Sequence, residues 1–182
     1  MKRREALKYS GFLTAAGLSA GTISAIMSGC KSPKPIDTGV AGWNIDQIDQ
    51  LKAITNVIIP TTDTPGAIDA AIPEDLARHV NDNFTTEEQE LFRAGLVNMD
   101  ERCREAHGKS FAKLSIAQQE TILNEIADEG GDPNLFEVLK GMTVYLFFTS
   151  EVGATQVLNY LPIPGEYQPC IDYADVGATW AL

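Results

Sequence analysis

The sequence predicts an all-α protein, a compact bundle of five or six helices with an irregular, proline-rich C-terminal arm. Two observations support this class. In several segments between residues 45 and 148, apolar residues recur every three or four positions, the spacing that lines one face of a helix. No stretch alternates apolar and polar residues for long enough to predict a sheet strand. We therefore expect helices joined by short turns.

The first two helices are bounded by caps and prolines. Asn44 can cap a helix with apolar positions at three- and four-residue spacing, and this helix must end before Pro60. The segment Thr61–Gly66 has the composition of a turn. Pro73 suits the first turn of a short helix that continues through Val80.

Two capping boxes mark the next helices. Thr85 followed by Glu88 predicts the start of a longer helix that ends near His107. Ser115 followed by Gln118 repeats the pattern and predicts another helix. In both segments the apolar residues after the box form a stripe, so each helix should bury one face.

The last predicted helix differs from the others because it has no polar face. It starts at Asp132-Pro133 and is apolar on nearly all sides from Met142 to Phe148, so we expect it to be the buried centre of the domain. From about Leu161 the chain contains three prolines, which exclude a regular element. This is the expected C-terminal arm.

Residues 1–29 have the composition of a bacterial signal peptide. A basic start is followed by an uncharged segment rich in small residues, which stops at a cysteine. Arg3 and Arg4, followed after two intervening residues by a leucine and a lysine, resemble the twin-arginine export signal, and the segment from Met27 to Cys30 resembles a lipobox. The sequence predicts twin-arginine export and a lipid on Cys30, which would anchor the protein at the periplasmic face of a bacterial membrane.

A retained transmembrane helix is the alternative for the uncharged segment. Residues 12–27 are fewer than the roughly 20 needed to span a bilayer, and glycines and hydroxyl side chains lower their hydropathy. Cleavage is therefore the favoured interpretation. Residues 30–43 contain two prolines and two glycines and are expected to form a flexible tether before a helical domain at 44–182.

The chain is acidic, which excludes some classes of partner. Its formal net charge is −11, and loss of residues 1–29 removes four basic residues and one acidic residue, giving −14. Nucleic acid and anionic lipid both require clustered lysine and arginine. Membrane attachment should therefore come from the lipid on the cysteine.

No catalytic, cofactor-binding or metal-binding motif is found. The only histidines are His79 and His107, neither of which belongs to a haem-attachment or zinc motif. Glu87, Glu88 and Glu90 could suggest a carboxylate site, but their place in a first helical turn favours a helix-dipole role. We expect no catalytic residue, cofactor or metal ion in this chain.

Two cysteines remain after the lipobox cysteine. In an exported protein, Cys103 and Cys170 could form a disulfide that fixes the C-terminal arm to the helix ending near His107. The alternative is that Cys103, which lies on an apolar stripe, is a buried free thiol. The sequence leaves both possibilities open.

Three segments carry a family resemblance: residues 58–67, residues 139–155, and the stretch from Pro162 to Cys170. Together they are similar to the small subunit of gluconate 2-dehydrogenase (subunit 3, or gamma chain). The resemblance extends over most of residues 45–170. It implies a non-catalytic subunit of a membrane-associated dehydrogenase complex that oxidises a sugar or sugar acid.

The resemblance also implies partners. The main one is a large FAD-dependent flavoprotein of the glucose-methanol-choline type, and a cytochrome c with haem c accepts its electrons. The large subunit is often exported by the twin-arginine signal of the small one, a role that Arg3 and Arg4 would serve here. The lipobox at Cys30 departs from many relatives and implies that this chain also anchors the complex.

Proline- and glycine-rich loops and aromatic side chains in these segments suit docking, because such loops lose little entropy on binding and aromatic residues are frequent hot spots. For Tyr145, Phe147 and Phe148, a place in the core is an equally good interpretation. The predicted partner-binding residues are Thr61, Asp63, Pro65, Tyr145, Phe148, Glu151, Pro164, Gly165 and Tyr167.

Two other functions are compatible with parts of the sequence. A free-standing envelope lipoprotein that binds a ligand or another envelope protein would share the signal and the lipobox. An autonomous enzyme would need a nucleophile with its base, or a set of metal ligands, and the sequence contains neither pattern. The accessory-subunit hypothesis explains more of the chain than either.

Overall fold

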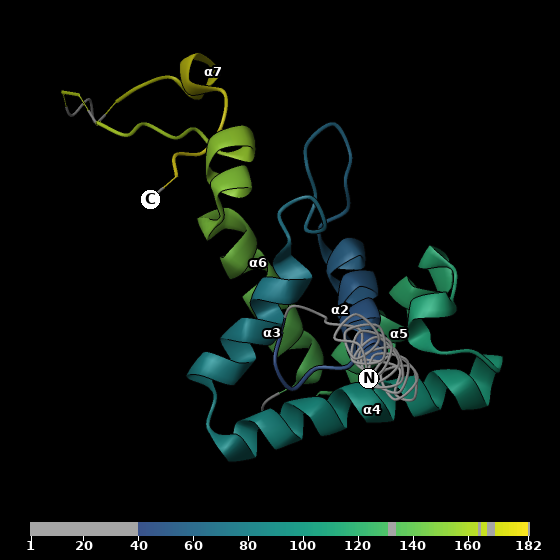
Figure 1. Cartoon of the computed structure of the whole chain (residues 1–182). Coiled ribbons are helices and arrows are strands. Elements are labelled where there is room, and N and C mark those ends of the chain that lie inside the picture. The colour runs from purple at the N-terminus through teal and green to yellow at the C-terminus, as the bar shows by residue number, and fades with distance from the viewer. Residues whose placement is uncertain (1–39, 131–133, 164, 167–169, 182) are drawn as a thin grey trace, which may run out of the picture. The chain divides into compact units, whose positions relative to one another are not determined.

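The computed structural model describes residues 40–130, 134–163, 165–166 and 170–181, and they confirm the all-α class. Apart from an isolated bridge between Asn159 and Trp180, these residues form no extended pairing. Five long helices account for most of this part of the chain (Figure 1). They are α2 (Ile45–Ile58), α3 (Ile72–Asn83), α4 (Thr86–His107), α5 (Ile116–Glu129) and α6 (Leu135–Thr149), with the short elements η1 (Phe111–Lys113), η2 (Gly153–Val157) and α7 (Tyr173–Val176).

The predicted helix starts are confirmed by their caps. Thr85 and Ser115 each accept a hydrogen bond from a backbone N–H three residues later, while Glu88 and Gln118 accept from the capping N–H in return. Asn44 begins α2 with the same reciprocal arrangement, which the sequence analysis gave only as a single cap. These local bonds satisfy backbone donors that have no partner inside a helix.

The start of α6 lies a few residues later than predicted. Asp132-Pro133 falls outside the described residues, and the helix begins at Leu135 with Asn134 as its cap. The Asn134 side chain accepts from the N–H of Phe136 at 2.8 Å and donates to the carbonyl of Ile126 at 2.9 Å. One buried amide therefore both starts α6 and closes the end of α5.

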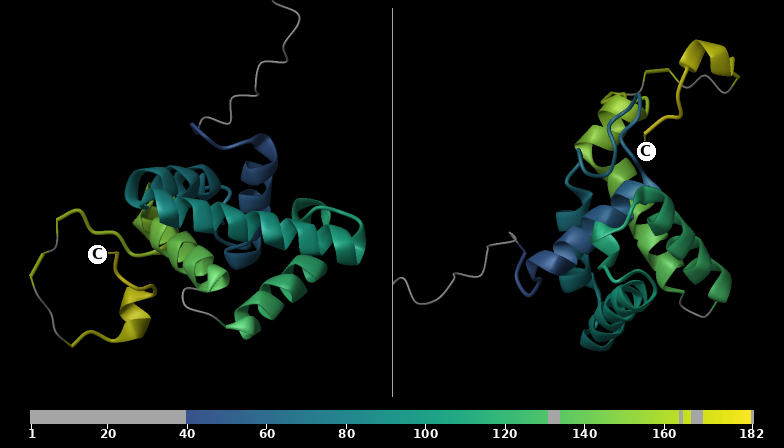
Figure 2. Two further views of the ribbon diagram at one scale, coloured as in Figure 1. Left: turned by 90° about the horizontal axis from the view of Figure 1, so that it is seen from below. Right: turned by 90° about the vertical axis from the view of Figure 1, so that its right-hand side faces the viewer.

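All five long helices contribute to the main hydrophobic core. α4 crosses the base of the bundle in Figure 1 and lies in front in the view from below in Figure 2. α2 contacts α3, α5 and α6. The fully buried side chains at the centre are Leu51, Ile54, Leu76, Val80, Leu96, Phe111 and Leu139.

A smaller hydrophobic cluster lies at the end of the bundle where α6 finishes. Ala67, Ile72 and Phe147 are buried together, and Ile59 and Val157 pack against them. This cluster joins the loop after α2 to the last turns of α6 and to η2. We call residues 59–71 together with residues 144–158 the distal end.

The last residues of the expected tether, 40–43, belong to the fold. Val40 and Trp43 are buried in the main core, so the domain starts before the predicted boundary at residue 44. The Arg93 guanidinium lies 4.1 Å from the centre of the Trp43 ring and donates to the carbonyl of Gly42 at 2.8 Å. Asn81 accepts from both Arg93 and Trp43. This latch fixes residues 40–43 to α3 and α4.

The expectation that α6 is buried on all sides is wrong. Its buried side chains lie on one face, at Leu139, Thr143 and Phe147. Tyr145 is 60% exposed and Phe148 is 38% exposed, although the sequence gives this helix no polar face. Other helices cover only one side of α6 near its C-terminal end, so an apolar face remains in contact with solvent.

The C-terminal arm is mostly irregular, as predicted, but its two ends are joined. The N–H of Asn159 donates to the carbonyl of Thr179 at 2.8 Å, and the N–H of Ala181 donates to the carbonyl of Asn159 at 3.0 Å. The arm, residues 159–181, therefore leaves the bundle and returns to the same point (Figure 1).

Within the described part of the chain, no helix combines the length and the hydropathy that a membrane crossing requires.

Candidate docking surface

The loop that connects α2 to α3 is held in shape by one carboxylate. Oδ2 of Asp69 accepts from the hydroxyl of Thr61 at 2.6 Å and from the N–H of Gly66 at 2.8 Å. The Thr61 hydroxyl, and then the Gly66 N–H, lower the pKa of Asp69 because both bond to its ionised form. The N–H of Ala67 also donates to the carbonyl of Ile59 at 2.9 Å, which closes the base of the loop.

Gly66 is required by the close approach of the chain to itself. A Cβ at this position would lie 2.5 Å from the backbone nitrogen of Thr61 and 2.8 Å from the carbonyl oxygen of Ile59. Because both are backbone atoms, no side-chain rotation could relieve the overlap. The segment predicted as a turn is therefore a tightly closed loop.

The end of α6 contains a second close approach that the sequence analysis missed. After α6 the chain continues into η2, a single π-helical turn, which is an unusual element. Ser150 bridges the joint, because its hydroxyl donates to the carbonyl of Phe147 at 2.6 Å and accepts from the N–H of Gly153 at 3.0 Å. The sequence feature that could have indicated this close approach is Gly153, a glycine inside a helical pattern.

These two close-packed elements lie side by side. A hollow of about 340 Å³ lies between the loop and the start of η2. The loop contributes threonine, aspartate and proline side chains, and η2 contributes Gln156. The structure thus brings together two of the segments that carry the family resemblance. The residues that line the hollow are Thr61, Thr62, Asp63, Thr64, Pro65, Asp69, Val152 and Gln156.

Apolar side chains of α6 also face solvent at the distal end. Tyr145 and Phe148 are exposed on α6, which supports a surface role for these two predicted residues rather than a place in the core. Phe147 is 1% exposed and belongs to the core, as the alternative interpretation held. Glu151 is exposed in the turn between α6 and η2.

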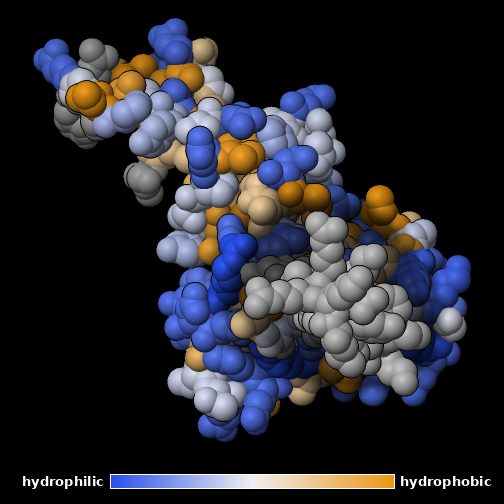
Figure 3. Space-filling view, in the orientation of Figure 1, coloured by the Kyte–Doolittle hydropathy of each residue, from blue (hydrophilic) through white to orange (hydrophobic). Residues whose placement is uncertain are grey.

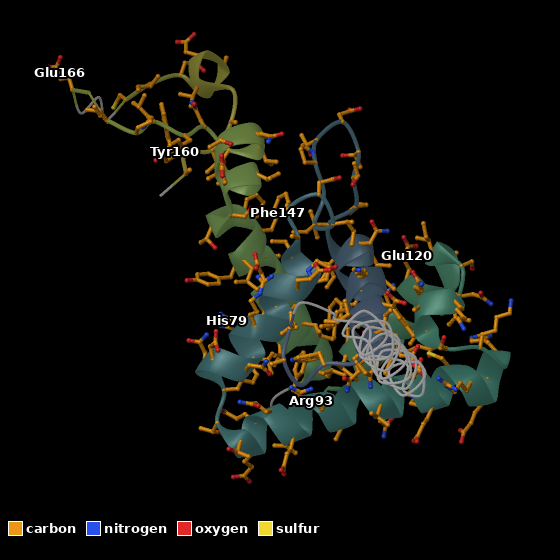
Figure 4. The ribbon with its side chains drawn as sticks, in the orientation of Figure 1. His79, Arg93, Glu120, Phe147, Tyr160 and Glu166 are labelled. Carbon is orange, nitrogen blue, oxygen red and sulfur yellow. The ribbon has the colours of Figure 1, made fainter. Side chains whose placement is uncertain are left out.

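The C-terminal arm also exposes apolar side chains. Figure 3 shows apolar side chains on the arm and on the upper part of the bundle, among polar ones. In Figure 4, Tyr160 lies at the base of the arm, Glu166 lies at its far end, and Phe147 lies within the distal end. Ile163 is 83% exposed. The exposed large apolar residues of the arm are Tyr160, Leu161, Ile163, Ile171 and Trp180.

Several predicted site residues are not tested by this geometry. Gly165 lies in the arm and is exposed. Pro164 and Tyr167, also predicted for the arm, lie outside the described residues, as do Arg3, Arg4 and Cys30 of the predicted export and lipid signals.

The two cysteines of the domain are not brought together. Cys103 is buried on the core side of α4, whereas Cys170 is exposed in the C-terminal arm, and both are free thiols in the structure. Burial raises the pKa of the Cys103 thiol. The structure therefore shows the buried free thiol that was the alternative to a disulfide.

The described residues contain no group of three or more histidine, cysteine, aspartate or glutamate side chains placed to hold a metal ion. His79 lies in α3 with its ring centre 6.3 Å from that of Tyr145, in an aromatic contact. Glu88 serves the cap of α4. The distal end thus presents a closed loop, a hollow and exposed aromatic side chains.

We expect the Asp69→Asn substitution to loosen the loop. The neutral amide is a weaker acceptor for Thr61 and Gly66 than the carboxylate that it replaces. Because the folded pKa of Asp69 is lowered, its contribution to stability is present above its ordinary pKa and is lost as the pH falls through the folded pKa. In NMR spectra, the amide proton of Gly66 should move upfield in the variant, and also on acidification of the wild type.

Asp63→Asn is the matched control for this titration, because the Asp63 carboxylate makes no hydrogen bond within the described residues. It should leave the Gly66 signal and its pH dependence unchanged. A Gly66 amide proton that does not respond to pH in the wild type would contradict the role of Asp69.

Comparison with known proteins gives one match. Residues 45–165 match the family described as gluconate 2-dehydrogenase subunit 3. The match covers more than half of the chain and includes the whole bundle, the closed loop and η2. No curated protein and no solved structure gives a significant match. The chain therefore belongs to the gluconate 2-dehydrogenase subunit 3 family, whose members are accessory subunits of a dehydrogenase complex.

Proposed function

We propose that this protein is the non-catalytic small subunit of a membrane-associated, FAD-dependent sugar or sugar-acid dehydrogenase, and that its distal end and arm bind the flavoprotein subunit. One observation carries the proposal. The motif segments around residues 58–67 and 139–155 are far apart in the sequence, yet they meet at one end of the bundle, where apolar side chains are exposed.

The exposed side chains are of the kind that interfaces use. Tyr145 and Phe148 present large aromatic area at the distal end, and exposed apolar surface of this type marks interaction sites in soluble proteins. The loop beside them is already closed by Asp69 and Gly66. Binding would therefore order little additional chain, so that little conformational entropy would oppose association.

In this proposal the redox chemistry belongs to the partners. FAD is bound by the large subunit, a flavoprotein of the glucose-methanol-choline type, and haem c by a cytochrome partner. The small subunit would assist folding, assembly and stability of the flavoprotein. The family membership supports this division, because the family is defined as one subunit of a larger dehydrogenase.

Export and anchoring complete the proposal. Arg3 and Arg4 would direct the folded small subunit, with the flavoprotein bound to it, through the twin-arginine route. Lipidation of Cys30 would then hold the complex at the periplasmic face of the membrane. The sequence motifs support this part of the proposal.

The test is the double substitution Arg3→Lys with Arg4→Lys, which keeps the charge of the signal and removes the arginine pair. We expect flavin-dependent sugar dehydrogenase activity to move from the envelope to the cytoplasm. Activity and the flavoprotein band should be measured in cytoplasmic, periplasmic and membrane fractions.

Cys30→Ser is the matched control, because it removes the lipid site and leaves the arginine pair intact. It should release activity into the soluble periplasm without trapping it in the cytoplasm. Normal membrane-bound periplasmic activity in the lysine variant would refute export by this chain.

A further inference from the structure

The distal end and the arm contain no basic side chain. The sequence has 14 lysine and arginine residues, but none lies between residues 53 and 77 or after Lys140. Both histidines also lie outside these two segments. The basic residues of the helical domain therefore lie elsewhere in the bundle.

The same surface carries exposed carboxylates. Six acidic side chains lie in residues 59–71 and 141–181, and all six are exposed. Within the described residues none of them forms an ion pair, whereas elsewhere Lys52, Arg78, Arg102 and Arg104 each pair with a carboxylate. The six residues are Asp63, Asp69, Glu151, Glu166, Asp172 and Asp175.

Acidic and apolar groups are both exposed at the distal end. Asp63 and Asp69 line the hollow, and Glu151 is exposed in the turn that leads from α6 to η2. Phe148 and Tyr145 are exposed on the preceding turns of α6. A partner that binds the distal end therefore meets exposed carboxylates as well as exposed aromatic rings.

We propose that the face of the flavoprotein that binds this surface is basic, with lysine or arginine side chains surrounding an apolar depression. This inference rests on the proposed function and adds the chemistry of the partner. A cation from that face would enter the hollow between the closed loop and η2, where Asp63, Asp69 and the threonine hydroxyls can accept its hydrogen bonds.

Two alternatives fit the charges less well. A second copy of this chain would place carboxylates against carboxylates, which costs free energy when both are desolvated. An anionic lipid surface would be repelled by a face without lysine or arginine. A basic protein surface complements both the charge and the apolar area.

Charge complementarity at the rim of an interface acts mainly on the association rate. Neutralising two of the exposed carboxylates should therefore slow association and reduce its dependence on salt. The full-length lipoprotein, purified in detergent and immobilised, would be titrated with the flavoprotein from the same native complex. Association rates would be compared at about 50 mM and about 500 mM NaCl, where the Debye length falls from about 14 Å to about 4 Å.

The test variant combines Asp63→Asn with Glu151→Gln. Its matched control combines Asp128→Asn on α5 with Glu105→Gln on α4, which removes the same two charges from exposed positions away from the distal end. At low salt we expect the test variant to associate about three- to tenfold more slowly than the wild type, and the control to change by less than about twofold.

The possible outcomes separate the two proposals. If the test variant and the control variant associate at equal rates, and these rates depend on salt in the same way, the basic-partner inference is overturned while the docking function stands. If the wild-type chain captures no flavoprotein at either salt concentration, the proposed function fails and the inference with it. Slower association of the test variant alone supports both.

Discussion

Replacing Gly153 by alanine is expected to destabilise the protein by about 3 kcal/mol, the upper part of the range for overpacked sites. The added Cβ would overlap the carbonyl oxygen of Phe147 and would lie 2.8 Å from its carbonyl carbon and 3.1 Å from the Cα of Phe148. All three are backbone atoms of the helix that the residue must pack against. The joint between α6 and η2 would have to open.

Gly141→Ala is the matched control, because it makes the same chemical change in the same stretch of chain. Gly141 lies inside α6, and beyond its chain neighbours and the nearby backbone of its own helix a Cβ there would have no heavy atom within 4 Å. Alanine should stabilise the helix at that position by roughly 0.5–1 kcal/mol. Urea unfolding of both variants measures the difference, and equal stabilities would show that the close approach at Gly153 is not rigid.

The second large effect is expected from the adjacent phenylalanines on α6. Phe147→Ala should cost about 3–5 kcal/mol, because its ring fills the small cluster with Ala67 and Ile72 and its removal leaves a cavity. Phe148→Ala should cost less than about 1.5 kcal/mol, mostly from its edge contact with the Phe147 ring at 5.2 Å. Two neighbouring rings of the same type thus have different expected effects.

Binding of the flavoprotein should show the reverse order of effects, with the larger direct loss in the Phe148 variant. Phe148→Ala should weaken binding of the flavoprotein by about tenfold or more, as loss of an interface hot spot does, while the variant remains folded. Phe147→Ala should lower binding only as far as the distal end unfolds. Thermal unfolding and pull-down of the flavoprotein measure the two effects, and a Phe148 variant that binds normally would place the interface elsewhere.

The sequence predicts those parts of the fold that depend on local interactions. The helices after Asn44, Thr85 and Ser115 begin where predicted, because each capping bond joins residues only three positions apart. The loop after α2 could be predicted as a turn from its prolines and glycine. Its closure could not, because the bond from Thr61 to Asp69 gives no periodic pattern.

Long-range contacts explain the parts that the sequence did not predict. Residues 40–43 have the composition of a tether, and they are ordered by Arg93, which lies 51 residues from Gly42. The apolar pattern of α6 does not reveal which face its neighbours cover, so Phe147 and Phe148 look equivalent in the sequence. The buried position of the one and the exposure of the other follow from packing alone.

The candidate site was predicted in composition but not in arrangement. Asp63, Tyr145 and Phe148 were identified through the family resemblance, and the structure places them at one end of the bundle. Gly153 and Asp69, which give this end its shape, were not identified. Asp69 acts through the Thr61 hydroxyl and the Gly66 N–H, and Gly153 through the backbone of α6, and the local sequence does not show that these groups come together.

The latch at residues 40–43 also determines how the domain would bear mechanical load. A pull applied through the N-terminal segment reaches Trp43, Arg93 and Asn81 before it reaches the first turn of α2. The tension is then shared between α3 and α4 and does not unwind α2 from its capped end. The side-chain contacts between Trp43, Arg93 and Asn81 would bear the force at the same time, and the domain would therefore resist extraction.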